Sequence, residues 1–111
     1  MKFATWNIRG LGSKRKQRML NNIMKQAAPD IIFVQETKCS IKMLNQIHSK
    51  WISRFEFLEV NAENSVVGIL TLWNPLNIGI IDAEASRNYL SVVIQPAGDR
   101  DTYLVTNVYG P

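Results

Sequence analysis

The order of apolar patterns along the chain constrains its fold more than any other feature of the sequence. Lys2–Asn7 is predicted to be a short strand, and after a loop with two glycines the apolar positions recur at helical spacing until Pro29 ends the helix. The continuous apolar run Ile31–Val34 follows directly, which is typical of a buried strand in a parallel pair. Ser40 can then cap a second helix. The first half of the chain is therefore predicted to run strand, helix, strand, helix.

The second half is predicted to consist of strands joined by short turns. The strand-like runs are Phe55–Val60, Val67–Trp73, Ile78–Glu84, Tyr89–Gln95 and Tyr103–Val108. This order predicts an α/β fold, with helices on one face of a mixed sheet and an antiparallel meander after it. Nothing in the pattern covers the outer face of the strands, and an uncovered apolar face favours self-association.

Charge is distributed unevenly along the sequence. The chain has 111 residues and a formal net charge of +4, and residues 1–29 carry seven basic side chains but no acidic one. A basic face of this kind favours partners that bear phosphate, nucleic acid among them. The solvated face of an amphipathic helix explains the same residues. Charge alone therefore leaves both interpretations open.

The cysteine and hydropathy patterns bear on the compartment. Cys39 is the single cysteine, which excludes an intramolecular disulfide and fits a reducing environment. Cys39 and the lone His48 cannot form a zinc site without further ligands. No stretch approaches the roughly 18 apolar residues of a membrane-spanning helix. We therefore expect a soluble, intracellular protein without a membrane partner.

Three polar residues stand at the ends of predicted strands: Asn7, Glu36 and Tyr109. Because the carboxyl ends of neighbouring parallel strands meet at one edge of a sheet, Asn7 and Glu36 are expected to lie side by side. A carboxylate and an amide oxygen suit a hard cation such as Mg²⁺, which takes oxygen ligands and keeps several waters. A turn asparagine and a solvated glutamate explain the same two residues without a metal.

The sequence around these residues resembles a known family. Thr5-Trp6-Asn7-Ile8-Arg9-Gly10, Val34-Gln35-Glu36-Thr37-Lys38 and Thr106-Asn107-Val108-Tyr109-Gly110-Pro111 resemble, in order, the first three motifs of the endonuclease/exonuclease/phosphatase family, whose members include exonuclease-III-like enzymes. The sequences of these motifs are most similar to those in the endonuclease domain of plant non-LTR (LINE-type) retrotransposons. Further pointers are Leu11-Gly12, Pro29-Asp30-Ile31-Ile32 and Leu72-Trp73-Asn74-Pro75. The resemblance covers the whole chain.

The resemblance implies a fold and a set of roles. Residues 1–111 would be one truncated domain, the amino-terminal half of a two-sheet α/β sandwich. Asn7 and Glu36 would hold a divalent metal, Mg²⁺ or Mn²⁺, and Tyr109 would lie at the scissile phosphate, so that these three residues form the catalytic set present in this chain. The substrate would be DNA, and a nuclear location would follow from that. Candidate nucleic-acid contacts are Arg9, Lys14, Arg15 and Lys38.

Two later motifs of the family are missing from this sequence, namely an Asp-x-Asn pair and a terminal Asp-His. His48 fits the face of a helix, and Asp99 and Asp101 fit a solvated hairpin turn. Catalytic groups that act as a unit lose nearly all activity when part of the unit is removed. We therefore expect this chain alone to have little or no turnover. The missing half would also supply the second sheet of the sandwich.

One smaller departure from the family pattern lies at Ser65-Val66-Val67-Gly68, where relatives often carry paired glycines, and little functional consequence is expected from it.

Two other functions stay open. The chain can be a non-enzymatic nucleic-acid-binding or interaction module that uses its basic helix and its exposed sheet. It can also be a phosphatase-type member of the same family, acting on a phosphoinositide or a small phosphate ester.

Overall fold

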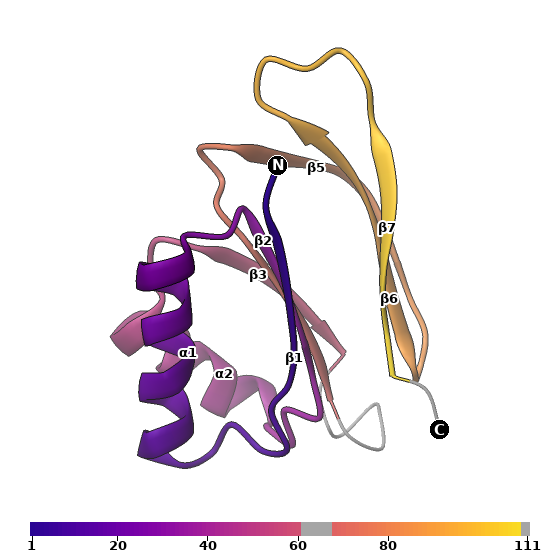
Figure 1. The fold of residues 1–111 in the computed structure, drawn as a ribbon. Helices are drawn as coiled ribbons and strands as arrows, with labels where there is room; N and C mark the ends of the chain where they lie inside the picture. Colours follow the sequence, from indigo (N-terminus) through magenta and orange to yellow (C-terminus); the bar gives the residue numbers. More distant parts are fainter. Residues whose placement is uncertain (61–67, 110–111) are drawn as a thin grey trace.

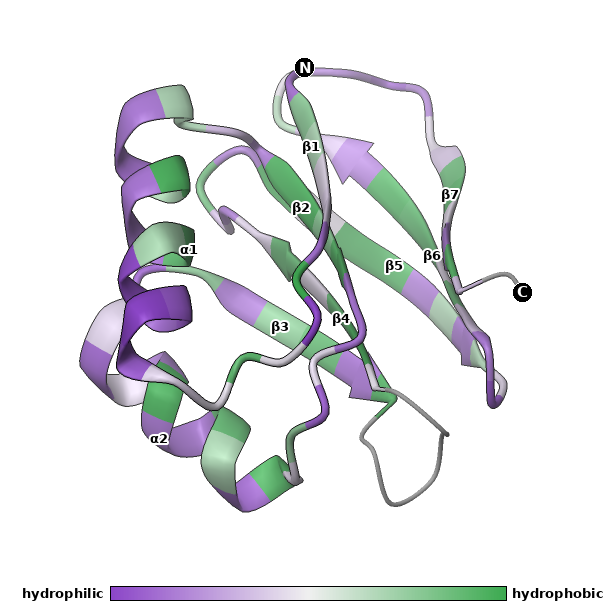
Figure 2. Cartoon of the chain, turned by 60° about the horizontal axis from the view of Figure 1, so that its bottom comes forward, coloured by the Kyte–Doolittle hydropathy of each residue, from purple (hydrophilic) through white to green (hydrophobic). Residues whose placement is uncertain are grey.

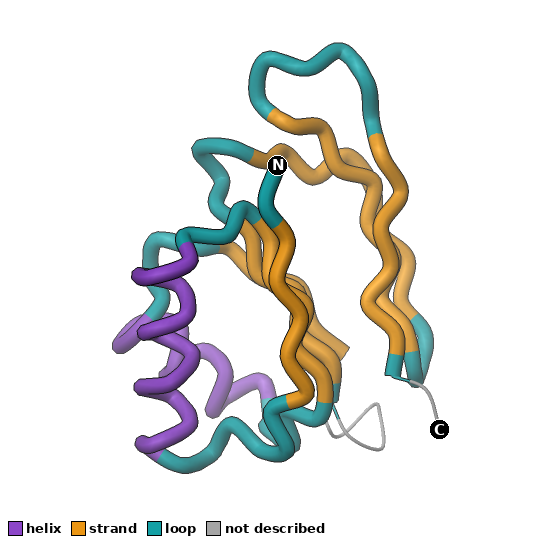
Figure 3. Tube along the Cα trace, viewed as in Figure 1, coloured by secondary structure: helices purple, strands orange, loops and turns teal. Residues whose placement is uncertain are grey.

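The computed structural model describes residues 1–60 and 68–109, which form three layers. Two helices cover one face of a four-stranded sheet, and a three-stranded sheet lies on the other face (Figures 1 and 3). The elements are β1 (Phe3–Asn7), α1 (Lys14–Ala27), β2 (Ile31–Gln35), α2 (Ile41–Trp51), β3 (Glu56–Val60), β4 (Ile69–Trp73), β5 (Ile78–Ala85), β6 (Tyr89–Pro96) and β7 (Tyr103–Val108). The predicted α/β class and element order are confirmed.

The four-stranded sheet has the strand order β1-β2-β4-β3. β1 and β2 are parallel and in register from Phe3 opposite Ile31 to Asn7 opposite Gln35. β4 pairs antiparallel with both β2 and β3. The apolar run in β2 is buried, with Ile31 and Val34 fully enclosed. The prediction of a buried strand in a parallel pair is therefore confirmed.

The second sheet corrects one expectation. β5, β6 and β7 form an antiparallel sheet of their own, so part of the second sheet belongs to this chain rather than to a missing half. This sheet packs on the first through a cluster that includes Trp73, Ile78, Val92 and Ile94. The sequence pattern could not separate the two sheets, because β3 to β7 all show the same kind of strand-like run.

The helices begin where side-chain caps are available. Ser13 Oγ accepts a hydrogen bond from Lys16 N (3.2 Å), and Ser40 Oγ accepts one from Met43 N (3.3 Å), which satisfies backbone donors that the first turn leaves free. The apolar faces of both helices are turned to the first sheet (Figure 2). Their buried residues, Leu20, Met24, Leu44 and Ile47, belong to one core cluster.

Apolar side chains remain exposed on the outside of the second sheet. Leu104 and Val108 of β7 are 70% and 53% exposed, and Ile81 of β5 is 55% exposed. β7 is hydrogen-bonded to β6 on one side and is the edge of its sheet in the described part of the chain.

No helix within residues 1–60 and 68–109 is long and apolar enough to span a membrane. The first residue of the predicted run Val67–Trp73 and the departure at residues 65–67 lie outside the described residues.

Candidate functional site

The ends of β1 and β2 bring the first two candidate residues to one edge of the sheet. Asn7 is opposite Gln35, so Glu36 is the next residue along the neighbouring strand. The two chains stay together beyond the strands, because Gly10 N donates to Glu36 O (2.7 Å) and Leu11 N donates to Thr37 O (2.9 Å). The arrangement follows from the parallel register, in which both chains leave the sheet in the same direction.

Backbone conformation is unusual at this edge. Arg9, Glu36 and Lys38 have φ values of 54°, 57° and 52°, in the left-handed region that side chains disfavour by roughly 1–2 kcal/mol per residue. Among the described non-glycine residues the other one with positive φ is Ala28, which ends α1. Strain of this kind collects at functional sites, where the surrounding structure holds it. The clustering therefore supports this edge as the candidate site.

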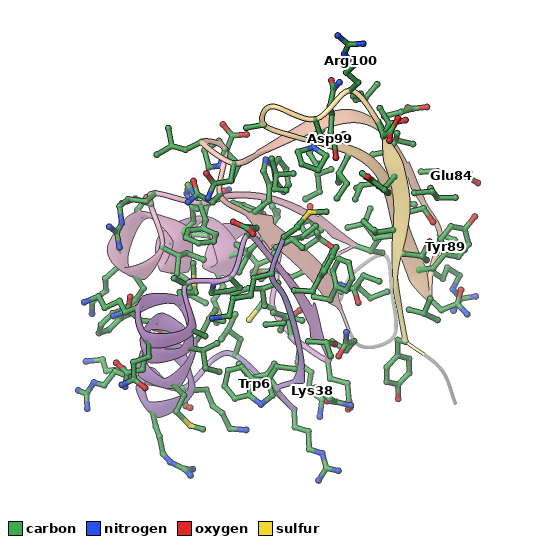
Figure 4. The ribbon with its side chains drawn as sticks, turned by 45° about the horizontal axis from the view of Figure 1, so that its top comes forward. Trp6, Lys38, Glu84, Tyr89, Asp99 and Arg100 are labelled. Carbon is green, nitrogen blue, oxygen red and sulfur yellow. The ribbon has the colours of Figure 1, made fainter. Side chains whose placement is uncertain are left out.

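The side chains at this edge are open to a ligand. Asn7, Arg9 and Lys38 are exposed, and Glu36 is half-buried. Figure 4 shows Lys38 at the same end of the molecule as Trp6 of β1. Within the described residues no three His, Cys, Asp or Glu side chains lie close enough together to hold a metal. Among the described residues, Glu36 and Asn7 are the candidate metal ligands at this edge.

Lys14 and Arg15 lie in the first turn of α1, and both are exposed. The start of α1 is at the same end of the molecule as the end of β1 (Figure 1). The next residue, Lys16, has a different role, because its Nζ donates to Ile8 O (2.6 Å) and lies 6.0 Å from the centre of the Trp6 ring. Lys16 thus ties α1 to the loop after β1.

Tyr109 follows β7 at the corresponding end of the second sheet. Its N–H donates to Asn88 O (2.9 Å), and its half-buried side chain packs against a cluster formed by Val60, Ile69 and Leu90. Ile69 is opposite Gln35 in the first sheet, so Tyr109 lies on the same end of the sandwich as Gln35. Gly110 and Pro111, the last residues of its motif, lie outside the described residues.

His48, Asp99 and Asp101, which were predicted to have no catalytic role, have structural roles. His48 in α2 forms a hydrogen bond with Phe55 O, and its ring lies 5.0 Å from the ring of Phe57. Asp99 accepts hydrogen bonds from Asp101 N (3.0 Å) and Tyr103 Oη (3.1 Å) within the turn between β6 and β7. Figure 4 shows Asp99 at the opposite end of the molecule from Lys38. The interpretations of a helix residue and a turn residue are confirmed.

Sequence reasoning gave no role to Gln35 and Asn107. Gln35 Nε2 donates to Thr5 Oγ1 (3.1 Å) and to Asn107 Oδ1 (2.8 Å). Asn107 is 1% exposed and lies between the two sheets. Both residues stood in the quoted motifs, but no local pattern distinguishes an amide that joins two sheets from one that faces solvent.

Comparison with known proteins gives the family and the fold. The sequence profile of the Endonuclease/Exonuclease/phosphatase family matches residues 4–103. No curated protein sequence matches this chain at a significant level. Among solved structures, Danio rerio TDP2 complexed with single-strand DNA product is 16% identical, with a TM-score of 0.73 over 96% of this chain and 44% of that protein.

Two further structures extend the range of similar proteins. The AP endonuclease LMAP of Leishmania major is 19% identical, with a TM-score of 0.70 over 97% of this chain and 39% of that one. A mannosyl-6-phosphatase of Bacteroides thetaiotaomicron is 9% identical, with a TM-score of 0.72 over 96% of this chain and 50% of that one. At these identities the likeness shows the fold alone, and the chain spans about half the length of the structures it matches.

Proposed function

The chain belongs to the endonuclease/exonuclease/phosphatase family, and on this premise we propose that it carries the metal- and phosphate-binding side of a site that hydrolyses phosphodiesters in DNA. The observation that carries the proposal is the juxtaposition of Asn7 and Glu36 at one edge of the sheet, where Arg9, Glu36 and Lys38 all have left-handed backbone. We propose that the parent protein is an endonuclease of the LINE-type retrotransposon kind, because the motif sequences of this chain are most similar to those of that group.

The donor set at this edge fits Mg²⁺, with Mn²⁺ as its close substitute. Glu36 offers a half-buried carboxylate and Asn7 an exposed amide oxygen. Magnesium is usually bound through one or two carboxylates and keeps several waters, whereas a zinc site needs nitrogen or sulfur ligands. When bound, the ion would polarise a phosphoryl oxygen and stabilise the leaving oxyanion.

The other residues of this edge would act on the substrate directly. Arg9 and Lys38 are exposed cations beside Glu36, and in the proposal they attract and orient the phosphates of the strand. Lys14 and Arg15 extend the same positive charge along the first turn of α1. The Tyr109 hydroxyl would contact the scissile phosphate from the second sheet.

We expect the 111-residue chain to bind metal and DNA with little or no hydrolysis. Phosphodiester hydrolysis also needs a group that activates water and a group that stabilises the transition-state charge. The sequence contains neither an Asp-x-Asn pair nor an Asp-His pair to supply them. The chain would then act as the amino-terminal part of a complete enzyme.

Mn²⁺ binding and plasmid nicking test these statements together. Mn²⁺ affinity, measured by electron paramagnetic resonance of the free ion, should fall in Glu36→Gln and stay unchanged in Glu84→Gln, whose carboxylate lies on β5. Supercoiled plasmid with Mg²⁺ should stay intact. Unchanged Mn²⁺ affinity in Glu36→Gln would contradict the metal site. Nicking that disappears in Glu36→Ala would contradict the expected inactivity.

A non-enzymatic nucleic-acid-binding module is the main alternative, favoured by the exposed Lys14 and Arg15 of α1. In that case DNA affinity would be the same with Mg²⁺ and with a chelator. A phosphatase-type activity would instead show as release of phosphate from a small ester. Both assays use the same protein preparation, so the three functions can be compared directly.

We further propose that the chain self-associates through the outer face of the second sheet and acts in the nucleus. Support for the first comes from the exposed Leu104 and Val108 on β7. Sedimentation equilibrium should show a dimer that Leu104→Lys weakens. Support for the second comes only from the proposed DNA substrate, and the distribution of a tagged chain in cells tests it.

A further inference from the structure

We propose that Gln35 and Asn107 form an amide clamp that positions Glu36 relative to Asn7 and Tyr109. The starting observation is that the side-chain amide of Gln35 touches both of the other motif-bearing strands. Its Nε2 donates one hydrogen bond to Thr5 Oγ1 on β1 and a second to Asn107 Oδ1 on β7. Residues from three separated parts of the chain are thereby joined through one nitrogen atom.

Asn107 makes the clamp rigid from the side of the second sheet. Its Nδ2 donates to Leu70 O (2.9 Å), Thr71 Oγ1 (3.3 Å) and Val34 O (3.4 Å), while its Oδ1 accepts from Gln35. A side-chain amide enclosed between two sheets is tolerated only when its donors and acceptor are satisfied. These bonds fix the orientation of Asn107 and fix β7 against β2 and β4 at this one point.

Stability alone does not require an amide at this place. Apolar side chains such as Val92 and Ile94 join the two sheets along the rest of their contact. An apolar pair of similar shape can replace a buried hydrogen-bonded pair at little cost in stability. Hydrogen bonds, unlike apolar contacts, define direction and register. The side-chain amides of Gln35 and Asn107 therefore suit a site whose function depends on the relative positions of its strands.

The clamp is adjacent to each residue of the candidate site. Gln35 immediately precedes Glu36, its backbone is opposite Asn7, and Asn107 is two residues before Tyr109. Glu36 also has the unfavourable φ of 57°, a conformation that persists only where the surrounding structure holds it. The side-chain amide of Gln35 fixes the residue that precedes Glu36. The hydrogen bond from Gly10 N to Glu36 O fixes Glu36 on its other side.

This inference rests on the proposed function, since it assigns Glu36 a metal to hold. Gln35 and Asn107 touch no metal in the proposal and act as positioning residues. Groups that orient a metal ligand typically change metal affinity by about 10–100-fold when they are replaced. A purely structural role predicts a lower melting temperature with unchanged metal affinity in the protein that remains folded.

The test compares Mn²⁺ affinity in isosteric variants of the full chain. Gln35→Met keeps the length of the side chain and removes both donors, and Thr5→Val removes one acceptor. Gln95→Met is the matched control, because Gln95 donates to Asp99 O (3.2 Å) at the far end of the second sheet. Circular dichroism confirms that each variant is folded at the temperature of the measurement.

We expect Gln35→Met to weaken Mn²⁺ binding by about 10–100-fold, Thr5→Val to weaken it less, and Gln95→Met to leave it unchanged. If Glu36→Gln weakens binding but folded Gln35→Met binds as tightly as wild type, the clamp is overturned and the metal site stands. If wild type shows no binding that depends on Glu36, the proposed function and the clamp both fall.

Discussion

Replacing Gly68 with alanine tests the packing directly behind the candidate site. Gly68 immediately precedes β4, has a φ of +86°, and its carbonyl accepts a hydrogen bond from Thr37 N (3.2 Å). A Cβ at this position would lie inside van der Waals distance of Thr37 Oγ1 and 3.2 Å from Lys38 N. Thr37 is fully buried, so its side chain has little room to move away.

Two separate costs add up in the Gly68→Ala variant. The left-handed backbone disfavours any side chain by about 1–2 kcal/mol, and forcing an extra methyl group into a packed region costs about 1–3 kcal/mol. The free energy of unfolding should therefore fall by about 2–5 kcal/mol, a large share of the roughly 5–15 kcal/mol of a typical domain. Gly68→Ala should be one of the most destabilising single-methyl changes in this chain.

Gly98→Ala is the matched control, because Gly98 has a φ of +80° and no atom within 4 Å of the added Cβ. It carries the backbone cost without the steric one, so the difference between the two variants isolates the contact with Thr37. Urea denaturation followed by circular dichroism measures both free energies. At roughly 4 °C per kcal/mol for a domain near this size, the melting temperatures should differ by about 4–12 °C.

The contact partner can be checked with a double-mutant cycle. Thr37 Oγ1 has no hydrogen-bond partner within the described residues, so Thr37→Ala alone removes an unsatisfied hydroxyl at modest cost. In the Gly68→Ala/Thr37→Ala double variant the steric cost should largely disappear, which gives a coupling of about 1–3 kcal/mol. The reasoning is refuted if Gly68→Ala costs no more than Gly98→Ala, or if the two effects simply add.

Three further predictions concern the surface. Ser13→Ala removes the cap of α1 and should lower the free energy of unfolding by about 1 kcal/mol in urea denaturation, whereas an unchanged value would show that the cap bond is not made in solution. The pKa of Tyr89 is raised because its hydroxyl donates a hydrogen bond to the Glu84 carboxylate. This bond therefore stabilises the fold at pH values below the ordinary pKa of tyrosine, and the stabilisation is lost as the pH rises through the raised pKa. Ultraviolet titration should show a lower pKa for Tyr89 in Glu84→Gln. DNA affinity should fall with rising salt, and Lys38→Ala should reduce the slope of log affinity against log salt by about 1, while a slope that does not change in this variant would exclude Lys38 as a phosphate contact.

The strand–helix–strand–helix order was predictable because its signals are local. Apolar positions at helical spacing define α1, and Ser40 caps the second helix as expected. The continuous apolar run Ile31–Val34 indicated a strand with both faces covered, which β2 is. Such patterns depend on side chains a few residues apart, so they survive without knowledge of the rest of the fold.

The division of the later strands into two sheets was not predictable. β3 and β4 join the helix-covered sheet, whereas β5, β6 and β7 form the sheet that packs against it. All five have similar strand-like sequences. Their pairing depends on which apolar faces meet in space, and the alternation within each strand carries no information about its partner. For that reason the expectation that a missing half supplies the second sheet was wrong.

The sequence by itself determined which residues stand at strand ends, and the resemblance of its motifs to a known family made Asn7, Glu36 and Tyr109 the candidates for chemistry. The tertiary structure alone decided how they are held. Gln35 and Asn107 are 72 positions apart in sequence and meet only because the two sheets pack face to face. An amide shows its partner only in the folded chain, since hydrogen bonding depends on distance and direction in space rather than on order along the sequence.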